Sequence, residues 1–458
     1  MTDDTIFAPS TAAGRAGIAV IRVSGPGAGL ALTSLGGNPI PPPREATLRR
    51  VADPHDGQAI DRGLLLWFPG PASFTGEDLA ELHLHGGRAV VAATLEALAR
   101  LPGLRPAEAG EFTRRAFDNG KLDLSAVEGL ADLIDADTEA QRRQALRQME
   151  GGLARLTGDW AARLTRVLAH FEAAIDFAEE ELPEELAREA LAAAKAVATE
   201  IAAALDDRHR GERLREGLSV VILGAPNAGK SSLLNALARR DVAIVSEAAG
   251  TTRDVVEVQL DLGGYPVILA DTAGLRDLAA AGETAQAAIE REGMARAQAR
   301  AAAADVKLLL VDLEAALRDD STLDAARALY DPRTILLLNK ADRCDPAEAA
   351  RLCGELAEYR PLVLSVRSGE GMEAALARLL DLAGDAFGGG EGAGITRLRH
   401  RRALEDCRDA LDRAGSAALP ELVAEELRLA LRALGRITGR VDVEDLLDIV
   451  FSEFCIGK

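Results

Sequence analysis

The stretch Gly224-Ala-Pro-Asn-Ala-Gly-Lys-Ser231 decides the fold, because it reads G-x-x-x-x-G-K-S between a β-rich run and a helical one. Glycines allow a backbone to wrap around phosphate, with its N–H groups pointing inward at the start of a helix. Lys230 would place its positive charge on the outer phosphates, and the Ser231 hydroxyl would ligate magnesium. The stretch therefore predicts a phosphate-binding loop (P-loop) in an α/β domain.

Around this loop, residues 218–382 alternate short β-rich runs with helical ones, which predicts a mostly parallel sheet covered by helices. The β-rich runs are Ser219–Leu223, Val255–Leu262, Pro266–Ala270, Lys307–Asp312, Thr334–Leu338 and Leu362–Ser365.

Two further motifs stand at the ends of these runs. Asp271-Thr-Ala-Gly274 follows the third run, where a carboxylate can reach the magnesium shell and the Gly274 N–H can meet the γ-phosphate. Asn339-Lys-Ala-Asp342 follows the fifth run. The Asp342 carboxylate can accept hydrogen bonds from N1–H and N2–H of guanine, a donor pair that adenine lacks, so the motif predicts a preference for GTP. Ser365-Val-Arg367 would close the base pocket through backbone N–H groups.

The residues expected to drive hydrolysis depart from the Ras pattern. Thr252 stands where a mobile switch threonine completes magnesium coordination. The place of the Ras glutamine that orients water is taken by Leu275, which cannot hydrogen-bond water. Glu290 is a candidate for this role, with a solvated helix glutamate as the alternative. No arginine finger is evident, and Asn227 with residues 246–250 could instead coordinate a monovalent cation near the phosphates.

The flanking regions differ in character from the α/β part. Residues 1–118 mix strand-like runs, such as 17–23 and 63–68, with a helix over 88–101, and indicate an α+β domain. Apolar residues recur at helical spacing in 119–215 and again over 398–438, while 384–394 is glycine-rich and reads as a linker. Four regions are predicted: 1–118, 119–215, 216–383 and 384–458, with the third inserted between two halves of a helical domain.

Composition narrows the setting of the protein. The formal net charge of −20 argues against a surface that coats nucleic acid, so any RNA contact must be local or made by a partner. None of the four cysteines forms a C-x-x-C pair, which favours a reducing compartment over a zinc site. No apolar run suits a signal peptide or a membrane span, and we expect a cytoplasmic protein without membrane contact.

Taken together, G-A-P-N-A-G-K-S, A-G-T-T-R-D, D-T-A-G-L-R, N-K-A-D and the terminal C-I-G-K resemble the MnmE (TrmE) family of tRNA-modification GTPases across the chain. The stretch S-F-T-G-E-D at 73–78 and the terminal C-I-G-K are the most specific markers, since ordinary GTPases lack both. The resemblance implies a Ras-like P-loop G domain inserted in an all-α domain, and a folate-binding N-terminal α+β domain that also dimerises. It further implies a homodimer and a heterotetramer with the flavin-dependent subunit MnmG.

The activity that the resemblance implies is potassium-dependent GTP hydrolysis coupled to tRNA modification. The modification adds an aminomethyl-type group to C5 of the wobble uridine, with a one-carbon unit from tetrahydrofolate (5-formyl or 5,10-methylene form). By match to the family, the potassium ligands are Asn227, Ser246, Ala248 and Thr251, the magnesium ligands are Ser231 and Thr252, and the folate contacts are Arg22, Glu81, Lys121 and Lys458. Glu290 corresponds to the water-positioning glutamate, and the catalytic assignment comprises Glu290, Lys230 and Arg276.

The full set of residues assigned to GTP is spread over five motifs. It comprises Asn227, Ala228, Gly229, Lys230, Ser231, Ser232, Ser246, Glu247, Ala248, Ala249, Gly250, Thr251, Thr252, Asp271, Thr272, Ala273, Gly274, Asn339, Lys340, Ala341, Asp342, Ser365, Val366 and Arg367.

Other functions remain open at this point. One alternative is a regulatory or ribosome-assembly switch GTPase without modification chemistry. The G-domain motifs alone do not distinguish such a switch from a modifying enzyme. Without the resemblance, the four folate positions would be read as surface charge. A catalytic thiol at Cys455 is an alternative to its structural packing. A folate-binding protein with a vestigial G domain conflicts with the intact nucleotide motifs.

Overall fold

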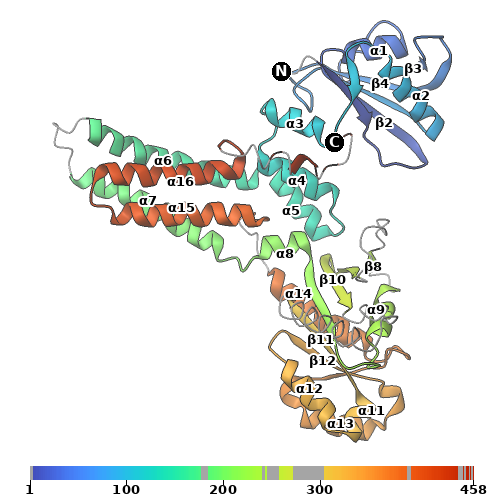
Figure 1. Cartoon of the computed structure of the whole chain (residues 1–458), viewed down its shortest axis with the longest axis vertical. Coiled ribbons are helices and arrows are strands. Elements are labelled where there is room, and N and C mark those ends of the chain that lie inside the picture. Colours follow the sequence, from blue (N-terminus) through green and yellow to red (C-terminus); the bar gives the residue numbers. More distant parts are fainter. Residues whose placement is uncertain are drawn as a thin grey trace, which may run out of the picture. The chain divides into compact units, whose positions relative to one another are not determined.

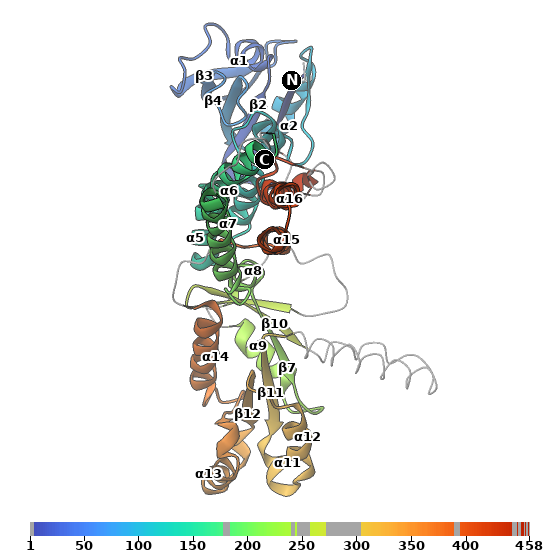
Figure 2. The same cartoon turned by 90° about the vertical axis from the view of Figure 1, so that its left-hand side faces the viewer.

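The protein is represented by a computed structural model, which describes residues 4–176, 184–239, 243–244, 257–271, 304–388, 394–441, 447, 450–452, 454 and 457 (Figures 1 and 2). The chain divides into two compact units. The first comprises 1–134, 146–201 and 402–458, and the second comprises 135–145 and 202–401. Each is described by itself.

The first unit begins with a six-stranded sheet in the order β3-β4-β5-β2-β1-β6. Its strands are β1 (Thr5–Pro9), β2 (Ala16–Ser24), β3 (Thr47–Ala52), β4 (Ala59–Phe68), β5 (Leu79–Gly86) and β6 (Leu104–Pro106). Alternate residues such as Ile21, Leu65 and Leu82 point to one face, where helices α1 (Ala28–Gly36) and α2 (Arg88–Ala99) cover them. The predicted α+β character of this region is confirmed.

The opposite face of this sheet carries solvent-exposed apolar side chains. Leu48 and Leu64 are direct partners in the β3–β4 register, and they are 53% and 39% exposed. Ile18, which lies at the register shift near the start of β2, is 61% exposed. The same face presents Arg22 and Glu81, because these residues alternate with the buried positions of β2 and β5.

The helices of the first unit come from both ends of the chain. They are α3 (Glu111–Asp118), α4 (Leu124–Ile134), α5 (Glu139–Met149), α6 (Gly152–Asp176), α7 (Glu184–Leu205), α15 (Leu398–Ser416) and α16 (Pro420–Thr438). The first part of α5, the end of α7 and the start of α15 belong to the second unit. Figure 1 shows α16 alongside α6, and Figure 2 looks along the same helices. Arg428 of α16 pairs with Glu172 of α6 at 2.5 Å. Helices before and after the α/β region thus form one helical domain, as the predicted insertion requires.

The second unit holds a seven-stranded sheet in the order β13-β12-β11-β7-β10-β9-β8. Its strands are β7 (Leu218–Leu223), β8 (Ala243–Ile244), β9 (Glu257–Leu262), β10 (Tyr265–Asp271), β11 (Val306–Asp312), β12 (Thr334–Asn339) and β13 (Leu362–Val363). Pairs from β13 to β10 are parallel, while β9 pairs antiparallel with β10 and with β8. The predicted mostly parallel sheet is confirmed.

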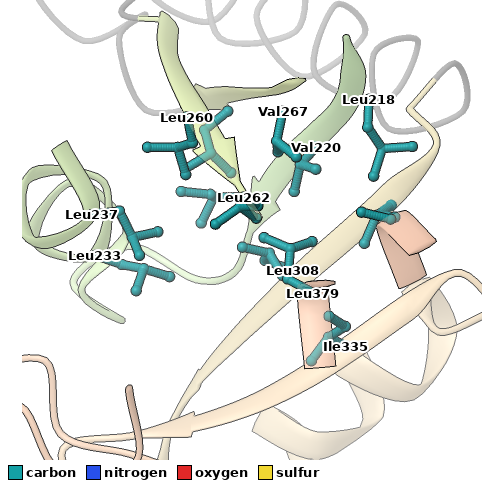
Figure 3. Close-up of a cluster of buried hydrophobic side chains, with 14 of the residues drawn as sticks. Leu218, Val220, Leu233, Leu237, Leu260, Leu262, Val267, Leu308, Ile335 and Leu379 are labelled. Carbon is teal, nitrogen blue, oxygen red and sulfur yellow. The ribbon is translucent and has the colours of Figure 1, made fainter. Parts of the chain in front are cut away.

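Both faces of this sheet are buried, because its strands are apolar at consecutive positions. Val220 and Ile222 point to the face covered by α9 (Lys230–Ala238) and α14 (Met372–Phe387), which Figure 3 shows through Leu233, Leu237 and Leu379. The other face, with residues such as Val221, Leu309 and Leu336, is covered by α11 (Leu313–Arg318), α12 (Ser321–Leu329) and α13 (Pro346–Glu355).

One predicted boundary was wrong. The linker expected from Gly384 does not begin there, since α14 continues to Phe387. Ala383 and Phe387 are buried against the sheet, and this burial outweighs the roughly 1 kcal/mol that a helical glycine costs. The predicted helical run 398–438 is confirmed and consists of two helices, because α15 ends at Ser416 and Pro420 starts α16. Within the described ranges, no helix combines the length and apolar character needed to cross a bilayer.

Candidate nucleotide and folate sites

The P-loop lies between β7 and α9, and two of its glycines are required by close contacts. Gly224 has a φ of +146°, and a Cβ there would lie 2.1 Å from the carbonyl oxygen of Leu310. Gly229 has a φ of +105°, and its Cβ would meet the Asn339 side chain at 2.4 Å. Lys230 starts α9, and its ammonium group donates to the carbonyls of Gly224 (2.8 Å) and Ala225 (3.0 Å). The loop thus curls around the lysine, as a phosphate cradle does.

Asn339 connects the P-loop to the predicted base pocket. Its side-chain amide donates to the Ala228 carbonyl at 2.7 Å, and its side-chain oxygen accepts from the Val366 N–H at 3.1 Å. The side chain is buried, so both polar ends are satisfied inside the protein. Residues far apart in the sequence therefore form one rigid corner at the carboxyl ends of the parallel strands, where ligands bind in open α/β sheets.

Asp342 lies at this corner with its carboxylate prepared to accept hydrogen bonds. Ser365 donates to Asp342 Oδ1 at 2.7 Å. This hydrogen bond, with further help from the charges of Arg367 and Arg343, holds the pKa of Asp342 below its ordinary value. The group is therefore ionised at neutral pH and suits the two N–H donors of a guanine edge.

A cavity of about 530 Å³ joins these parts. Its lining includes the predicted residues Asn227, Gly229, Ser232, Asn339, Lys340, Asp342, Val366 and Arg367. It also includes Asn235, Ala236, Arg239 and Arg343, which sequence reasoning missed. The helical spacing of Ser232, Asn235 and Arg239 was the available signal, since residues three and four apart share a helix face.

Several predicted nucleotide residues lie outside the described residues. These are Ser246, Glu247, Ala248, Ala249, Gly250, Thr251, Thr252, Thr272, Ala273, Gly274, Arg276 and Glu290. Asp271 is placed by its backbone as the last residue of β10, the expected position. The potassium set is thus represented by Asn227 alone and the magnesium set by Ser231 alone.

In the first unit, two of the predicted folate residues form a pair. Arg22 Nε and Nη2 both donate to Glu81 Oε1, at 3.1 and 3.0 Å. The second carboxylate oxygen, Oε2, bonds His83 Nε2 at 3.0 Å. The Arg22 guanidinium also lies 5.3 Å from the centre of the Phe74 ring, close enough for a cation–π contact. Sequence reasoning missed His83 and Phe74, although Phe74 belongs to the quoted S-F-T-G-E-D stretch.

The third predicted folate residue, Lys121, lies against the loop that carries Phe74. Its ammonium group donates to the Pro71 carbonyl at 3.0 Å, and the neighbouring Asn119 amide donates to the Thr75 carbonyl at 2.8 Å. Lys121, the loop, Arg22 and Glu81 therefore follow one another across the same part of the domain.

A largely buried ion-pair network around Arg115 holds the loop that carries Phe74. Arg115, 6% exposed, donates to Glu77 at 3.1 Å and to Asp4 at 2.9 Å. Glu77 also accepts from Ser24 at 2.9 Å. Burial alone would lower the pKa of Arg115, but its carboxylate partners outweigh burial and raise it. The network fixes the loop on the strand that carries Arg22.

The C-terminal segment reaches the strand beside Arg22. Gly457 has a φ of +99°, and a Cβ there would lie 2.0 Å from the Pro9 carbonyl oxygen. Ser10 donates to the Gly457 carbonyl at 3.0 Å. Because Pro9 pairs with Ile21 in the β1–β2 register, the segment ends near Arg22. Lys458 and Cys455 themselves lie outside the described residues.

The chain is similar to known proteins over its whole length. Residues 124–455 match the family described as MnmE helical domain, and residues 5–121 match GTP-binding protein TrmE N-terminus. The tRNA modification GTPase MnmE of Parvibaculum lavamentivorans is 56% identical, covering 99% of this chain and 100% of that protein. The protein of the same name from Rhodospirillum rubrum is 54% identical over 100% of both chains. The mitochondrial 5-taurinomethyluridine-[tRNA] synthase subunit GTPB3 of Danio rerio is 48% identical, covering 100% of this chain and 93% of that one.

Proposed function

This chain belongs to the MnmE (TrmE) family of tRNA-modification GTPases, and we propose that it couples potassium-dependent GTP hydrolysis to modification of the tRNA wobble uridine. With a flavin-dependent partner it adds an aminomethyl or carboxymethylaminomethyl group to C5 of uridine 34 in certain tRNAs. A tetrahydrofolate derivative, in the 5-formyl or 5,10-methylene form, supplies the one-carbon unit. The GTP hydrolase activity is common to the family, whereas the cation, the partner and the modification chemistry are the proposal.

One observation carries the modification chemistry: the Arg22–Glu81 pair of β2 and β5 lies one strand away from Pro9 of β1, against which Gly457 packs. The pair is 21% and 16% exposed, so it is neither buried core nor freely solvated charge. A GTPase that acts only as a switch does not require a second polar binding site in its N-terminal domain. Arg22, Glu81 and Lys121, with Lys458 following Gly457, supply charged groups of both signs for a folate's glutamate tail and pterin ring.

At the nucleotide site, the residues present fit a magnesium-bound guanine nucleotide. A Cβ at Gly224 would collide with the Leu310 carbonyl and one at Gly229 with the Asn339 side chain, so the loop takes this conformation only with glycine at both positions. Lys230 would bind the outer phosphates, Asp342 would bind the base, and Ser231 with Thr252 would ligate magnesium. The metal, when bound, neutralises charge that develops on the phosphates.

Asn227 supports the potassium dependence. It lies at the open rim of the P-loop with a φ of +63°, a conformation that asparagine tolerates better than most residues. The residue is exposed, so its side-chain oxygen can serve as a ligand, together with Ser246, Ala248 and Thr251. A bound cation would supply positive charge in a site where no arginine finger is evident. We expect faster GTP hydrolysis in potassium than in sodium buffer, and equal rates would contradict this part of the proposal.

The proposed assembly is a homodimer that joins the flavin-dependent subunit MnmG in a heterotetramer. Leu48 and Leu64 support the homodimer, because these two large apolar residues are direct cross-strand partners and both are open to water. With a net charge of −20, the chain suits a local contact with tRNA, or a contact made through its partner.

Nucleoside analysis of tRNA from cells that lack this chain tests the proposal. Loss of the C5 modification at uridine 34 is expected, with restoration by the wild-type gene. A gene carrying Glu81→Ala should fail to restore it, whereas Glu96→Ala, which alters an exposed helix residue of the same domain, should succeed. Unaltered modification in the deletion strain would favour the alternative, a regulatory or ribosome-assembly switch GTPase.

A further inference from the structure

Asp312 connects two structural elements behind the base pocket. It is the last residue of β11 and pairs in parallel register with Asn339, the first residue of N-K-A-D. One carboxylate oxygen, Oδ1, accepts from the backbone N–H groups of Glu314 (3.1 Å) and Ala315 (3.4 Å), and so caps α11. The other oxygen, Oδ2, accepts from Lys340 Nζ at 2.6 Å. No sequence motif assigned above includes Asp312.

Lys340 needs such a restraint because its backbone is unfavourable. Its φ and ψ are 69° and 35°, the left-handed region, which is unfavourable for a residue other than glycine. The surrounding structure must hold a residue in that state. The ion pair with Asp312 is a suitable restraint, since both side chains are only 22% exposed and the bond is short.

We propose that Asp312 is a positioning residue for guanine recognition. It acts through Lys340, which sets the orientation of the Asp342 carboxylate. Lys340 lines the cavity beside Asn339 and Asp342. With its ammonium group anchored on Asp312, the aliphatic part of Lys340 forms a fixed wall of the base pocket. The left-handed turn at Lys340 directs the following 3₁₀ turn, Ala341–Arg343, so that Asp342 reaches Ser365 and the guanine edge.

No nearby carboxylate among the described residues replaces Asp312 as the partner of Lys340. Glu314 is the other carboxylate at this end of α11, but it pairs with Arg318 at 2.5 Å and with Arg343 at 3.8 Å. Among the described residues, Asp312 is the group that holds the Lys340 ammonium.

Two substitutions separate this role from helix capping. Asp312→Asn keeps an oxygen that caps α11, because asparagine is as good a cap as aspartate, but it removes the charge that holds Lys340. Lys340→Met removes the charge from the other side and keeps the aliphatic wall. Glu314→Gln is the matched control, since it neutralises the neighbouring carboxylate without touching Lys340.

Equilibrium binding of GTP and ITP to the full chain provides the measurement. Inosine lacks the 2-amino group, so the ratio of GTP to ITP affinity reports whether Asp342 makes both of its hydrogen bonds. We expect Asp312→Asn and Lys340→Met each to weaken GTP binding about tenfold, mainly through faster dissociation, and to shrink the preference for GTP over ITP. The double variant should bind no more weakly than either single one, because both remove the same interaction. In hydrolysis assays, the loss should fall on KM rather than on kcat.

Wild-type-like GTP affinity in Asp312→Asn would overturn the proposal, as would additive losses in the double variant. An unchanged GTP-to-ITP ratio would also overturn it, because a general loosening of the domain would weaken both nucleotides equally.

Discussion

Replacing Arg401 by leucine should loosen the junction through which the chain passes into and out of the α/β region. Arg401, 5% exposed, donates to both carboxylate oxygens of Glu212 at 2.7 and 2.9 Å. It also donates to Asp207 at 2.6 Å and to the Leu205 carbonyl at 2.9 Å. Arg401 lies on the segment that follows the α/β region in the chain, and its partners lie on the segment that precedes it. The two segments touch so closely that a Cβ on Gly211 would lie 2.0 Å from the Ile395 carbonyl.

The expected cost follows from the two carboxylates left behind. Removing one partner of a buried ion pair destabilises by roughly 3–5 kcal/mol, because the remaining charge stays buried without compensation. Arg413 offers a matched control on the same helix. It makes an equally bidentate pair with Glu426, at 2.9 and 2.8 Å, but its side chain is 55% exposed. Exposed pairs contribute about 0–1 kcal/mol, so Arg413→Leu should cost far less than Arg401→Leu.

Hydrogen–deuterium exchange of peptides covering 205–217 measures the effect locally. A loss of roughly 3–5 kcal/mol accelerates exchange by about two to three and a half orders of magnitude, since each 1.4 kcal/mol is tenfold. Peptides of β7 and α9 serve as the internal reference. If Arg401→Leu changed exchange in 205–217 no more than Arg413→Leu does, the junction would not depend on Arg401.

The destabilisation caused by Arg401→Leu should also depend on pH. Burial alone would raise the pKa of Glu212, but hydrogen bonds and charge from Arg401 outweigh burial and hold it below its ordinary value of 4.5. A carboxylate with a lowered pKa in the folded state stabilises the protein above its unfolded pKa, and this contribution disappears as the pH falls through the folded value. The difference between wild type and Arg401→Leu should therefore be largest near neutral pH and disappear as the pH falls through the lowered pKa of Glu212.

Three further predictions concern the two sites. Gly457→Ala should undock the C-terminal segment from Pro9, weakening tetrahydrofolate binding in calorimetry while GTP turnover persists; unchanged folate affinity would show that the docked segment does not serve that site. Gly229→Ala should displace Asn339 and lower GTP affinity at least tenfold in fluorescence titrations, because both a positive φ and a 2.4 Å contact oppose the new methyl group; binding within twofold of wild type would contradict this. Glu290→Ala should leave nucleotide affinity nearly intact and slow single-turnover hydrolysis strongly; near-normal turnover would mean that another residue holds the water.

Much of the nucleotide site could be predicted from the sequence because its parts are local. The P-loop is one continuous stretch whose backbone conformation depends on its own glycines, since Gly224 and Gly229 have positive φ and leave no space for a side chain. The N-K-A-D motif likewise follows a buried strand, so its position at the sheet edge follows from the alternation of strands and helices. The switch residues and Glu290 lie outside the described residues, and their roles stay predictions.

The proposed folate site was accessible only through family resemblance. Arg22 and Glu81 are 59 positions apart, and nothing in either neighbourhood indicates the other. Their pairing depends on the β2–β5 register, in which Arg22 lies directly opposite Glu81. His83 and Phe74 were missed for the same reason, since an isolated histidine or phenylalanine has no sequence signal that separates a site from ordinary packing.

By itself, the sequence determined the kinds of local structure in this protein: a phosphate loop, a guanine-reading motif, an α/β alternation and helical flanks. Only the tertiary structure decided which distant residues meet, such as Arg401 with Glu212, Asp312 with Lys340, and the C-terminal segment with β1. The reason is physical. Local conformation depends on the preferences of neighbouring residues, whereas strand register and helix packing depend on burying apolar faces that the chain brings together from far apart.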